Sequence, residues 1–504
     1  MDLLKRMSES VETYISRYAI DICSSNTFFY GKDRSLSHIL VKRTGFSPEE
    51  SELYCRREVC SMDRAKLPES FLFGTATASY QVEGAAFEDG RTSSIWDDFA
   101  KVPGAVVEAA DGRVASDQYH HIEEDIDLMH ELGFKAYRFS ISWSRVLPHA
   151  GNVPNEKGIE YYKKICRLLH ERGMTAVATL YHWDLPSELE EKGGWTNRET
   201  AFEFQRYAEL MYKELDGLVD IWITINEPWC IAYLGYRFGV HAPGRRNIED
   251  AVKAIHHVNL AHGLAVRSHR KMNLKAPVGI VLNPQTPRPA TRREKDREAA
   301  ITKRAVDTEV FLGPLMGKGY PKYCTETLKW NFPIEEGDMD IISQKFDFLG
   351  VNYYCEYPVV YDETSLDHAR QVPCWERHTD IGWPVDEKGL LRQLLWLDEY
   401  TDGLPIMITE NGSAEDDVLT PDGRVHDRER IEYIDKHLHA CAEAIEKGVN
   451  LHGYFAWSFI DNYEWAEGYR KRFGIVYCDY RTLKRYPKDS AYYLRDVMAG
   501  YGDF

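Results

Sequence analysis

Residues 405–412 read Pro405-Ile406-Met407-Ile408-Thr409-Glu410-Asn411-Gly412. The apolar, partly β-branched run predicts a short buried strand, and the Asn-Gly pair behind it predicts a turn. Glu410 is therefore a charge at the point where a core strand meets a loop. Residues 221–228 repeat this design as Ile221-Trp222-Ile223-Thr224-Ile225-Asn226-Glu227-Pro228. Two glutamates at strand ends indicate a pair of catalytic carboxylates, with an ordinary solvated turn residue as the alternative for each.

Short β-rich runs of this kind recur along the chain and alternate with helical patterns. Alternating strands and helices form a parallel sheet, and eight such strands close into a barrel. The predicted fold class is α/β, a single (β/α)8 TIM barrel with long strand-to-helix loops. The β-rich runs lie at 71–81, 135–143, 175–183, 221–226, 277–283, 346–354, 405–410 and 451–457, and helical patterns at 122–132, 159–171, 200–215, 248–271, 297–311, 390–400 and 428–447.

The first 61 residues lie outside this alternation. Apolar residues from Leu3 to Tyr18 fall at helical spacing and predict an amphipathic helix, but no period persists between Asp21 and Ser61. We therefore expect a partly helical N-terminal extension of unknown role over residues 1–61, and a catalytic barrel domain over residues 62–504.

Composition disfavours several classes of partner. The formal net charge of -18 argues against nucleic acid and anionic membrane surfaces. No stretch reaches the ~20 apolar residues of a membrane span, and the first residues lack the apolar core of a secretory signal. The ten cysteines show no paired spacing and indicate reduced thiols. We expect a cytoplasmic protein, either a monomer or a homo-oligomer.

Polar and aromatic side chains gather at the ends of the eight predicted strands. The carboxyl ends of parallel strands meet at one rim of a barrel, where such enzymes carry their active sites. Buried polar groups at this rim need partners, and sugar hydroxyls would supply them. Each residue alone has a structural explanation, but their coincidence indicates a site. They are Gln81, Arg138, His182, Trp183, Asn226, Glu227, Asn283, Asn352, Tyr354, Glu410 and Trp457.

The segment after the eighth strand is unusually acidic and aromatic. It reads Trp457-Ser458-Phe459-Ile460-Asp461-Asn462-Tyr463-Glu464-Trp465. An indole can cover the apolar face of a pyranose while a carboxylate accepts hydrogen bonds from two hydroxyls. The segment therefore suits a sugar site, with a tryptophan-rich core loop as the alternative.

Six motifs in this order resemble the signatures of family 1 glycoside hydrolases, the β-glucosidases. The resemblance extends from about Leu67 to Tyr492. It implies a retaining exo-β-glucosidase that acts on a small-molecule β-glucoside or oligosaccharide without a cofactor, with β-galactosides and β-fucosides as further substrates. The motifs are Phe71–Gly84 (FLFGTATASYQVEG), Tyr137–Ser140 (YRFS), Tyr181–Asp184 (YHWD), Asn226–Pro228 (NEP), Ile408–Gly412 (ITENG) and Asn462–Trp465 (NYEW).

The resemblance also implies a role for each glutamate. Glu410 would be the nucleophile that forms a glycosyl-enzyme, and Glu227 would be the acid and base. In such retaining enzymes the two carboxyl groups lie ~5–5.5 Å apart. Arg138 is expected to keep Glu410 ionised and Tyr354 to donate a hydrogen bond to it, while the second carboxylate should raise the pKa of Glu227.

A sugar site follows from the same resemblance. Asn226 is expected to contact the 2-hydroxyl of the sugar. Glu464 should repel a phosphate, because relatives that take 6-phosphorylated sugars carry serine there. Glu227 argues against myrosinase activity, since those relatives carry glutamine there. The expected sugar contacts are Gln81, His182, Trp183, Asn226, Asn352, Trp457, Glu464, Trp465 and Phe473.

The outer, aglycone side of the site is predicted to be aromatic. Its two principal tryptophans could instead be loop anchors. The expected residues are Trp229 and Trp383, with Tyr233, Phe238 and His241 as further candidates.

The sequence leaves two other functions open. A transglycosidase would pass the glycosyl group to an alcohol instead of water, and a non-hydrolytic sugar-binding protein could use the same barrel without needing both carboxylates. No metal site is expected. The group formed by His120, His121, Glu123 and Glu124 lacks a converging fourth ligand.

Overall fold

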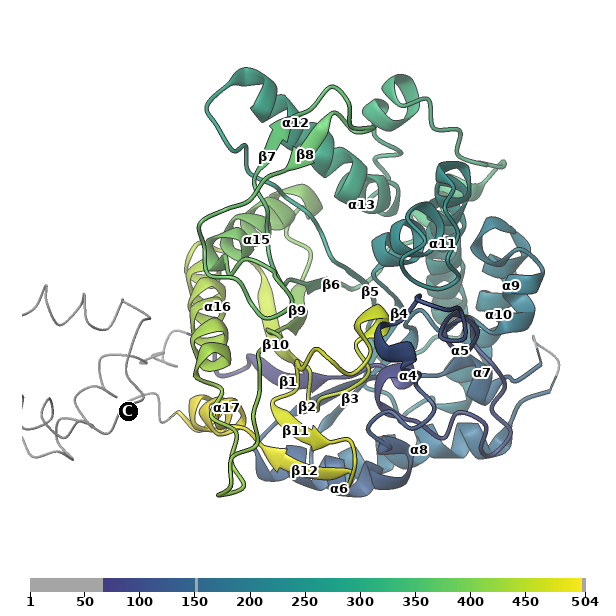
Figure 1. Cartoon of the computed structure of the whole chain (residues 1–504). Coiled ribbons are helices and arrows are strands. Elements are labelled where there is room, and N and C mark those ends of the chain that lie inside the picture. Colours follow the sequence, from purple (N-terminus) through teal and green to yellow (C-terminus); the bar gives the residue numbers. More distant parts are fainter. Residues whose placement is uncertain (1–66, 150–152, 501–504) are drawn as a thin grey trace, which may run out of the picture. The chain divides into compact units, whose positions relative to one another are not determined.

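The computed structural model describes residues 67–149 and 153–500, and within them eight parallel strands close a barrel. The strands follow the order β1-β10-β9-β6-β5-β4-β3-β2 around the barrel, and β2 pairs with β1 to close it. Helices surround the barrel (Figure 1). The predicted (β/α)8 TIM barrel is confirmed. Its strands are β1 (Leu72–Ala76), β2 (Ala136–Ser140), β3 (Thr175–Tyr181), β4 (Ile221–Asn226), β5 (Val278–Leu282), β6 (Phe348–Asn352), β9 (Ile406–Asn411) and β10 (Leu451–Trp457).

Most of the long helices lie where the hydrophobic periodicity predicts them. α11 (Ile248–Lys271) has the predicted bounds and begins where Asn247 Oδ1 accepts hydrogen bonds from two backbone N–H groups of the first turn. The single helix predicted over 297–311 is instead α12 (Glu294–Arg304) and α13 (Val310–Leu315), because the wider turn of a π-helix, η5 (Ala305–Glu309), separates them. The remaining α-helices are α4 (Ser79–Val82), α5 (Ile95–Phe99), α6 (Gln118–Glu131), α7 (Trp143–Val146), α8 (Glu156–Glu171), α9 (Ser187–Glu191), α10 (Glu199–Glu214), α14 (Asp338–Ile342), α15 (Glu387–Thr401), α16 (Arg428–Glu446) and α17 (Asp489–Ala499).

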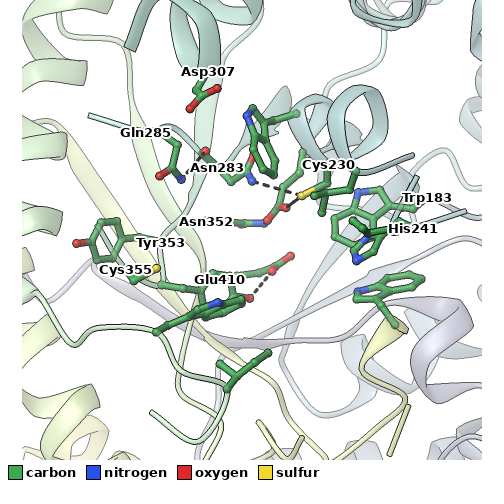
Figure 2. A pocket seen from close by; sticks show the side chains of 18 of the residues that line it. Trp183, Cys230, His241, Asn283, Gln285, Asp307, Asn352, Tyr353, Cys355 and Glu410 are labelled. Atoms are coloured by element: carbon green, nitrogen blue, oxygen red, sulfur yellow. Dashed lines mark hydrogen bonds between the residues drawn. The ribbon is translucent and has the colours of Figure 1, made fainter. Parts of the chain in front are cut away.

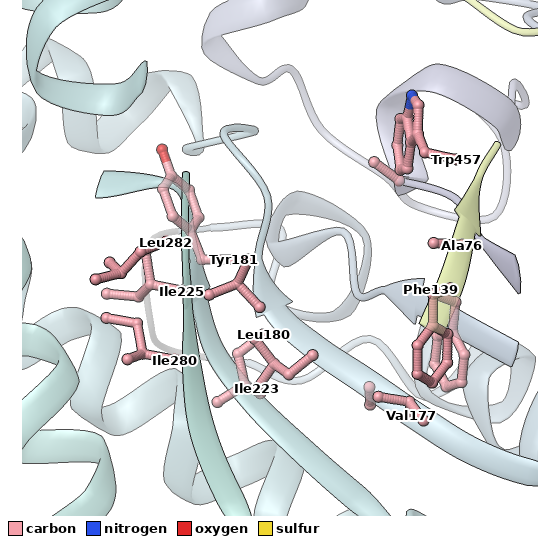
Figure 3. Packing of buried hydrophobic residues seen from close by; sticks show 14 of the residues in the cluster. Ala76, Phe139, Val177, Leu180, Tyr181, Ile223, Ile225, Ile280, Leu282 and Trp457 are labelled. Atoms are coloured by element: carbon pink, nitrogen blue, oxygen red, sulfur yellow. The ribbon is translucent and has the colours of Figure 1, made fainter. Parts of the chain in front are cut away.

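Side chains of the strands form a continuous apolar core. Val177 on β3, Ile223 on β4 and Ile280 on β5 are buried and belong to one cluster (Figure 3). Strands of a barrel that helices cover are buried on both faces, which explains why their sequences are nearly continuous apolar runs. Most of the polar residues singled out in the sequence stand at or just after the strand ends, but the prediction is wrong for two of them: Arg138 lies within β2, and Gln81 lies on the short helix α4 because β1 ends before it.

Two antiparallel hairpins are added to the barrel. β7 (Val359–Tyr361) pairs with β8 (Ala369–Gln371) in the long segment before β9, and β11 (Val476–Asp479) pairs with β12 (Lys484–Pro487) after β10. Their strands have three or four residues, too few for a periodic sequence pattern to show.

In the part of the chain that the structure describes, no helix is long and apolar enough to cross a membrane. Within residues 67–149 and 153–500, no three His, Cys, Asp or Glu side chains converge as a metal ion would require. The predicted N-terminal helix and the predicted boundary at residues 61 and 62 lie outside the described residues.

A buried ion cluster fastens the start of α17 to the rim of the barrel. Lys488 Nζ contacts Asp417 at 2.5 Å and Asp461 at 2.8 Å, and all three side chains are almost inaccessible to solvent. Asp461 lies in the segment after β10 that also carries Glu464. Three cations balance three carboxylates in this cluster: Arg430, Arg472 and Lys488 with Asp417, Asp427 and Asp461.

We expect Lys488→Met to lower the free energy of unfolding by about 3–5 kcal/mol, because it leaves one buried carboxylate without a compensating charge. Lys484→Met is the matched control, since Lys484 is exposed on β12 and its replacement should cost less than about 0.5 kcal/mol. Urea denaturation followed by tryptophan fluorescence measures both values. Equal losses in the two variants would contradict the stabilising role of the cluster.

Candidate active site

A cavity of about 660 Å³ opens at the C-terminal ends of the barrel strands. Figure 2 shows Glu410 on one side of it and Trp183 and His241 on the other. The structure therefore brings most of the predicted site residues together from distant parts of the chain. The predicted residues that line the cavity are His182, Trp183, Glu227, Trp229, Asn352, Tyr354, Trp383, Glu410, Trp457, Glu464, Trp465 and Phe473.

Three predicted residues, Gln81, Arg138 and Asn226, do not line this cavity. All three side chains are completely buried and contact residues that do line it. Arg138 therefore acts on the site through Glu410. Direct contact of Gln81 and Asn226 with a sugar stays a prediction.

Glu410 lies on β9 and is held by two donors. Arg138 Nη1 on β2 donates to Oε1 at 2.6 Å, and the Tyr354 hydroxyl donates to Oε2 at 2.6 Å, as predicted. Burial raises the pKa of Glu410, and the Arg138 guanidinium and Tyr354 hydroxyl oppose that rise. The net direction is upward, so Arg138 limits the effect of burial without reversing it.

Glu227 directly follows β4 and is held by neutral donors. Its Oε1 accepts a hydrogen bond from Asn352 Nδ2 at 2.5 Å, and its Oε2 accepts one from Cys230 Sγ at 2.8 Å. Burial and then the charge of Glu410 raise the pKa of Glu227 to about 7. The expected rise is present, although burial contributes more to it than the second carboxylate does.

Asn226 and Asn352 connect the surroundings of the two glutamates. Asn226 Oδ1 accepts hydrogen bonds from Arg138 Nη2 at 2.7 Å and from Asn352 Nδ2 at 3.1 Å. Thr409 Oγ1 donates to Asn352 Oδ1 at 2.8 Å, which fixes the orientation of that amide so that its nitrogen faces Glu227. Two amides and a guanidinium therefore connect the two carboxylates through hydrogen bonds.

Two buried polar atoms in this region lack partners. Asn226 Nδ2 donates to His182 Nε2 at 3.0 Å, so the neutral imidazole carries its proton on Nδ1. Burial and the nearby Arg138 hold the pKa of His182 well below its usual value. His182 Nδ1 and Gln81 Oε1 find no hydrogen-bond partner among the described residues. A free donor and a free acceptor suit hydroxyl groups, which can both accept and donate.

The pKa of Glu464 is raised above that of an ordinary glutamate. Gln81 Nε2 donates to its Oε2 at 3.4 Å. Burial, followed by the charge of Glu410, raises the pKa of Glu464 to about 8. Burial therefore opposes ionisation of this side chain before a ligand binds. The expectation that its charge repels a phosphate stays a prediction.

Tryptophans line one side of the cavity. Two of them, and Glu227, have a strained backbone. The rings of Trp183 and Trp465 lie 4.6 Å apart, and Trp457 stacks on His182 at 5.9 Å. Trp183, Glu227 and Trp465 have φ angles of 76°, 47° and 47°, in the left-handed region that side chains other than glycine rarely adopt. Such backbone strain is often found at functional sites.

Aromatic residues predicted for the aglycone side line the cavity, and their contact with an aglycone stays a prediction. Trp229 and Trp383 line it, and the Trp383 ring lies 5.3 Å from that of Tyr354. Of the three further candidates, Phe238 and His241 line the cavity. Tyr233 does not, because it is completely buried and its hydroxyl donates to the backbone carbonyl of Val306.

Several lining residues were not predicted to belong to the site. Lys303 and Asp307 come from α12 and η5, which looked like one ordinary helix in the sequence. Nothing in their local pattern marks them, since the π-turn that brings Asp307 to the cavity leaves no sequence period. Cys230 could have been noticed, because it stands three residues after Glu227 at the start of the next helical turn.

Comparisons with known proteins show the family of this chain. The family described as Glycosyl hydrolase family 1 matches residues 63–502. Beta-glucosidase A of Thermotoga maritima is 43% identical over 446 residues, which are 88% of this chain and 99% of that protein. The bifunctional beta-D-glucosidase/beta-D-fucosidase of Bifidobacterium breve is 40% identical over 460 residues, which are 86% and 98% of the two chains.

Comparison with solved structures gives a similar result. The beta-glucosidase from Thermotoga maritima in complex with deoxynojirimycin matches with a TM-score of 0.83 and 42% sequence identity, covering 86% of this chain and 98% of that chain. The family match spans the whole described barrel, and the relatives match over nearly their full length. The chain therefore belongs to glycosyl hydrolase family 1.

Proposed function

We propose that this glycoside hydrolase is a retaining exo-β-glucosidase, with Glu410 as nucleophile and Glu227 as acid and base. It removes terminal non-reducing β-D-glucosyl residues from a small-molecule β-glucoside or an oligosaccharide. β-Galactosides and β-fucosides are further candidate substrates, and the Bifidobacterium breve relative, named for both glucosidase and fucosidase activity, supports the latter.

The proposed reaction has two displacements. A carboxylate oxygen of Glu410 attacks the anomeric carbon, and the bond from that carbon to the leaving oxygen breaks while Glu227 gives its proton to that oxygen. Glu227, now ionised, then takes a proton from water, whose oxygen attacks the same carbon and releases Glu410. Two inversions leave the anomeric configuration of the sugar unchanged.

The division of roles rests on one observation above all. Glu410 touches the Arg138 guanidinium, whereas the donors to Glu227 are the Asn352 amide and the Cys230 thiol, which are neutral. A cation favours the ionised form that a nucleophile needs, while burial beside a second carboxylate favours the proton that an acid needs. The surroundings of the two glutamates thus suit different tasks.

Sugar specificity is supported by the atoms left without partners. His182 Nδ1 can donate to a hydroxyl and Gln81 Oε1 can accept from one. The Thermotoga maritima relative has been solved with deoxynojirimycin, a sugar-like ligand. We propose that the two unpartnered atoms bind neighbouring hydroxyls of the non-reducing sugar.

The test is hydrolysis of a chromogenic β-glucoside by the purified full chain, with the first-formed anomer of glucose followed by proton NMR. The expected first product is β-glucose. Initial α-glucose would overturn the retaining mechanism, and bound glucose without turnover would favour a sugar-binding protein. A glycosyl product that dominates over glucose when an alcohol competes with water would favour a transglycosidase.

The proposed acid sets the alkaline limit of activity. Glu227 must be protonated to act, so kcat/KM is expected to be retained below pH about 7 and to fall above it, in line with its raised pKa. A pH profile on an unactivated β-glucoside measures this limit. Glu464→Gln should leave the limit in place, although burial raises the pKa of Glu464 to about 8 as well. If Glu464→Gln lost the alkaline limb, the limb would belong to Glu464, and its assignment to Glu227 would be wrong.

Three wider assignments belong to the same proposal. The seven cysteines within the described residues are all free, which suits the reducing cytoplasm. The net charge of -18 disfavours nucleic acid as a partner, and a homo-oligomer is a candidate state. Residues 62–504 are the proposed catalytic domain, because the family match begins at residue 63.

A further inference from the structure

Cys230 occupies a special position beside the proposed acid. It is the first residue of a π-helix, η4 (Cys230–Arg237), and its side chain lines the cavity although it is only 7% exposed. In Figure 2 a dashed line joins its sulfur to Asn283. Its sulfur is 2.8 Å from Oε2 of Glu227.

The direction of the hydrogen bonds follows from their partners. Asn283 Nδ2 donates to Cys230 Sγ at 3.4 Å, which uses the sulfur as an acceptor. The S–H group is then free to donate to Glu227. Burial and the nearby Glu227 charge raise the pKa of the Cys230 thiol well above its usual value, so the thiol keeps its proton.

Cys230 and Asn352 together clamp Glu227. The amide of Asn352, on β6, donates to Oε1, while the thiol of Cys230, on η4, donates to Oε2. One donor on each oxygen fixes the plane of the carboxyl group. Because an ionised carboxylate accepts both hydrogen bonds without conflict and a protonated one must turn its own O–H elsewhere, the clamp favours the ionised form.

Other charged groups also face Glu227. Glu410 on β9 and Glu464 after β10 oppose its ionisation, and Arg138 on β2 favours it. Tyr354 is held neutral, since burial and the charge of Glu410 raise its pKa. A substitution at Cys230 leaves all four of these groups in place, so its effect on Glu227 can be measured separately.

We propose that Cys230 is a positioning residue of the reaction, whose thiol holds Oε2 of Glu227 and stabilises the carboxylate that forms when the leaving oxygen takes the proton. This assignment rests on the proposed role of Glu227. The thiol takes no proton from the substrate and forms no covalent bond. Its effect is to make Glu227 a stronger acid in the first displacement.

The decisive experiment compares Cys230→Ala with Cys230→Ser in the full chain. Alanine removes the donor, so the alkaline limb of kcat/KM should move upward by about half to one pH unit, because the ionised form of Glu227 loses a hydrogen bond. Serine keeps an O–H donor and should leave the limb within about 0.3 pH unit of the wild type. A simple packing role would instead lower activity in both variants without moving the limb, and that result would overturn the proposal.

A matched control uses another buried thiol. Cys441 lies on α16, is fully buried and does not line the cavity, so Cys441→Ala should leave the pH profile unchanged. An equal shift in Cys441→Ala would contradict a specific role for Cys230. If Cys230→Ala fails to fold, infrared spectra of the wild type against Cys230→Ser still decide. The S–H band of Cys230 should move to lower wavenumber as the pH rises through the titration of Glu227, and a band that stays fixed would refute the contact.

Failure of this proposal can be told apart from failure of the proposed function. If Glu227→Ala loses activity mainly on poor leaving groups while Cys230→Ala keeps the wild-type limb, Glu227 is the acid and Cys230 does not position it. If Glu227→Ala loses activity equally on all leaving groups, the role of Glu227 itself is wrong, whatever the cysteine variants do.

Discussion

Glu410→Gly is expected to lower kcat for β-glucosides by about 10⁴-fold or more, because no other group can form the glycosyl-enzyme. Glycine also opens a space where the carboxylate stood, on the face of the sugar opposite the leaving group. Azide can enter this space and attack the anomeric carbon of an activated β-glucoside directly. A single displacement inverts the configuration, so the rescued product should be α-glucosyl azide.

Stopped assays of glucose release measure the loss of kcat, and NMR of the rescued product gives its anomeric configuration. Glu415→Gln serves as the control, because Glu415 lies a few residues beyond Glu410, pairs with Arg377 and does not line the cavity. Its activity should stay within about threefold of the wild type. A β-configured azide product from Glu410→Gly would show that the nucleophile is elsewhere.

The second large effect is expected from Glu227→Ala, and it should depend on the leaving group. General acid catalysis contributes about 10²–10⁴-fold, so kcat/KM should fall by that factor for an alkyl glucoside whose oxygen needs protonation. A dinitrophenyl glucoside leaves without a proton, and its kcat/KM should fall by less than about tenfold. Its glycosyl-enzyme still forms at Glu410, and azide should then release β-glucosyl azide, the opposite anomer from that of Glu410→Gly.

Steady-state kinetics on a series of aryl glucosides measure this dependence as a slope against leaving-group pKa. Glu227→Gln is a second variant for the same test. Its side chain has nearly the size of glutamate and can form hydrogen bonds, but it has no acidic proton to transfer. Both variants should show a steeper slope than the wild type. An unchanged slope in both would remove Glu227 from the acid role.

The barrel and most of its rim could be predicted because both depend on patterns local in the chain. A buried parallel strand reads as an apolar run, and a polar residue at its end marks the rim. Glu227, Glu410 and Trp457 were found in this way. The same reasoning cannot tell how deep a polar strand residue lies. Asn226 ends β4 and Arg138 lies within β2, yet both are completely buried and do not line the cavity.

The cavity-lining residues on helices could not be predicted, for a different reason. Lys303 on α12 and Asp307 on η5 line the cavity, and which side of a helix faces the barrel rim depends on packing between distant segments. The pKa shifts of the buried carboxyl groups could not be predicted from the sequence either. Burial outweighs Arg138 at Glu410 and raises the pKa of Glu464, and burial is a property of the folded chain.

The left-handed backbone at Trp183, Glu227 and Trp465 has a consequence for protein engineering. Each such residue carries strain of about 1–3 kcal/mol, which glycine would relieve at the same φ angle. At Trp183 and Trp465 the loss of aromatic packing, about 3–5 kcal/mol for a buried tryptophan, would outweigh that relief. At Glu227 the replacement removes only a buried carboxyl group beside Glu410, so a library selected for heat resistance alone would favour glycine there and return stable proteins that no longer turn over substrate. Thermal selection of this enzyme should be coupled to a turnover screen from the first round.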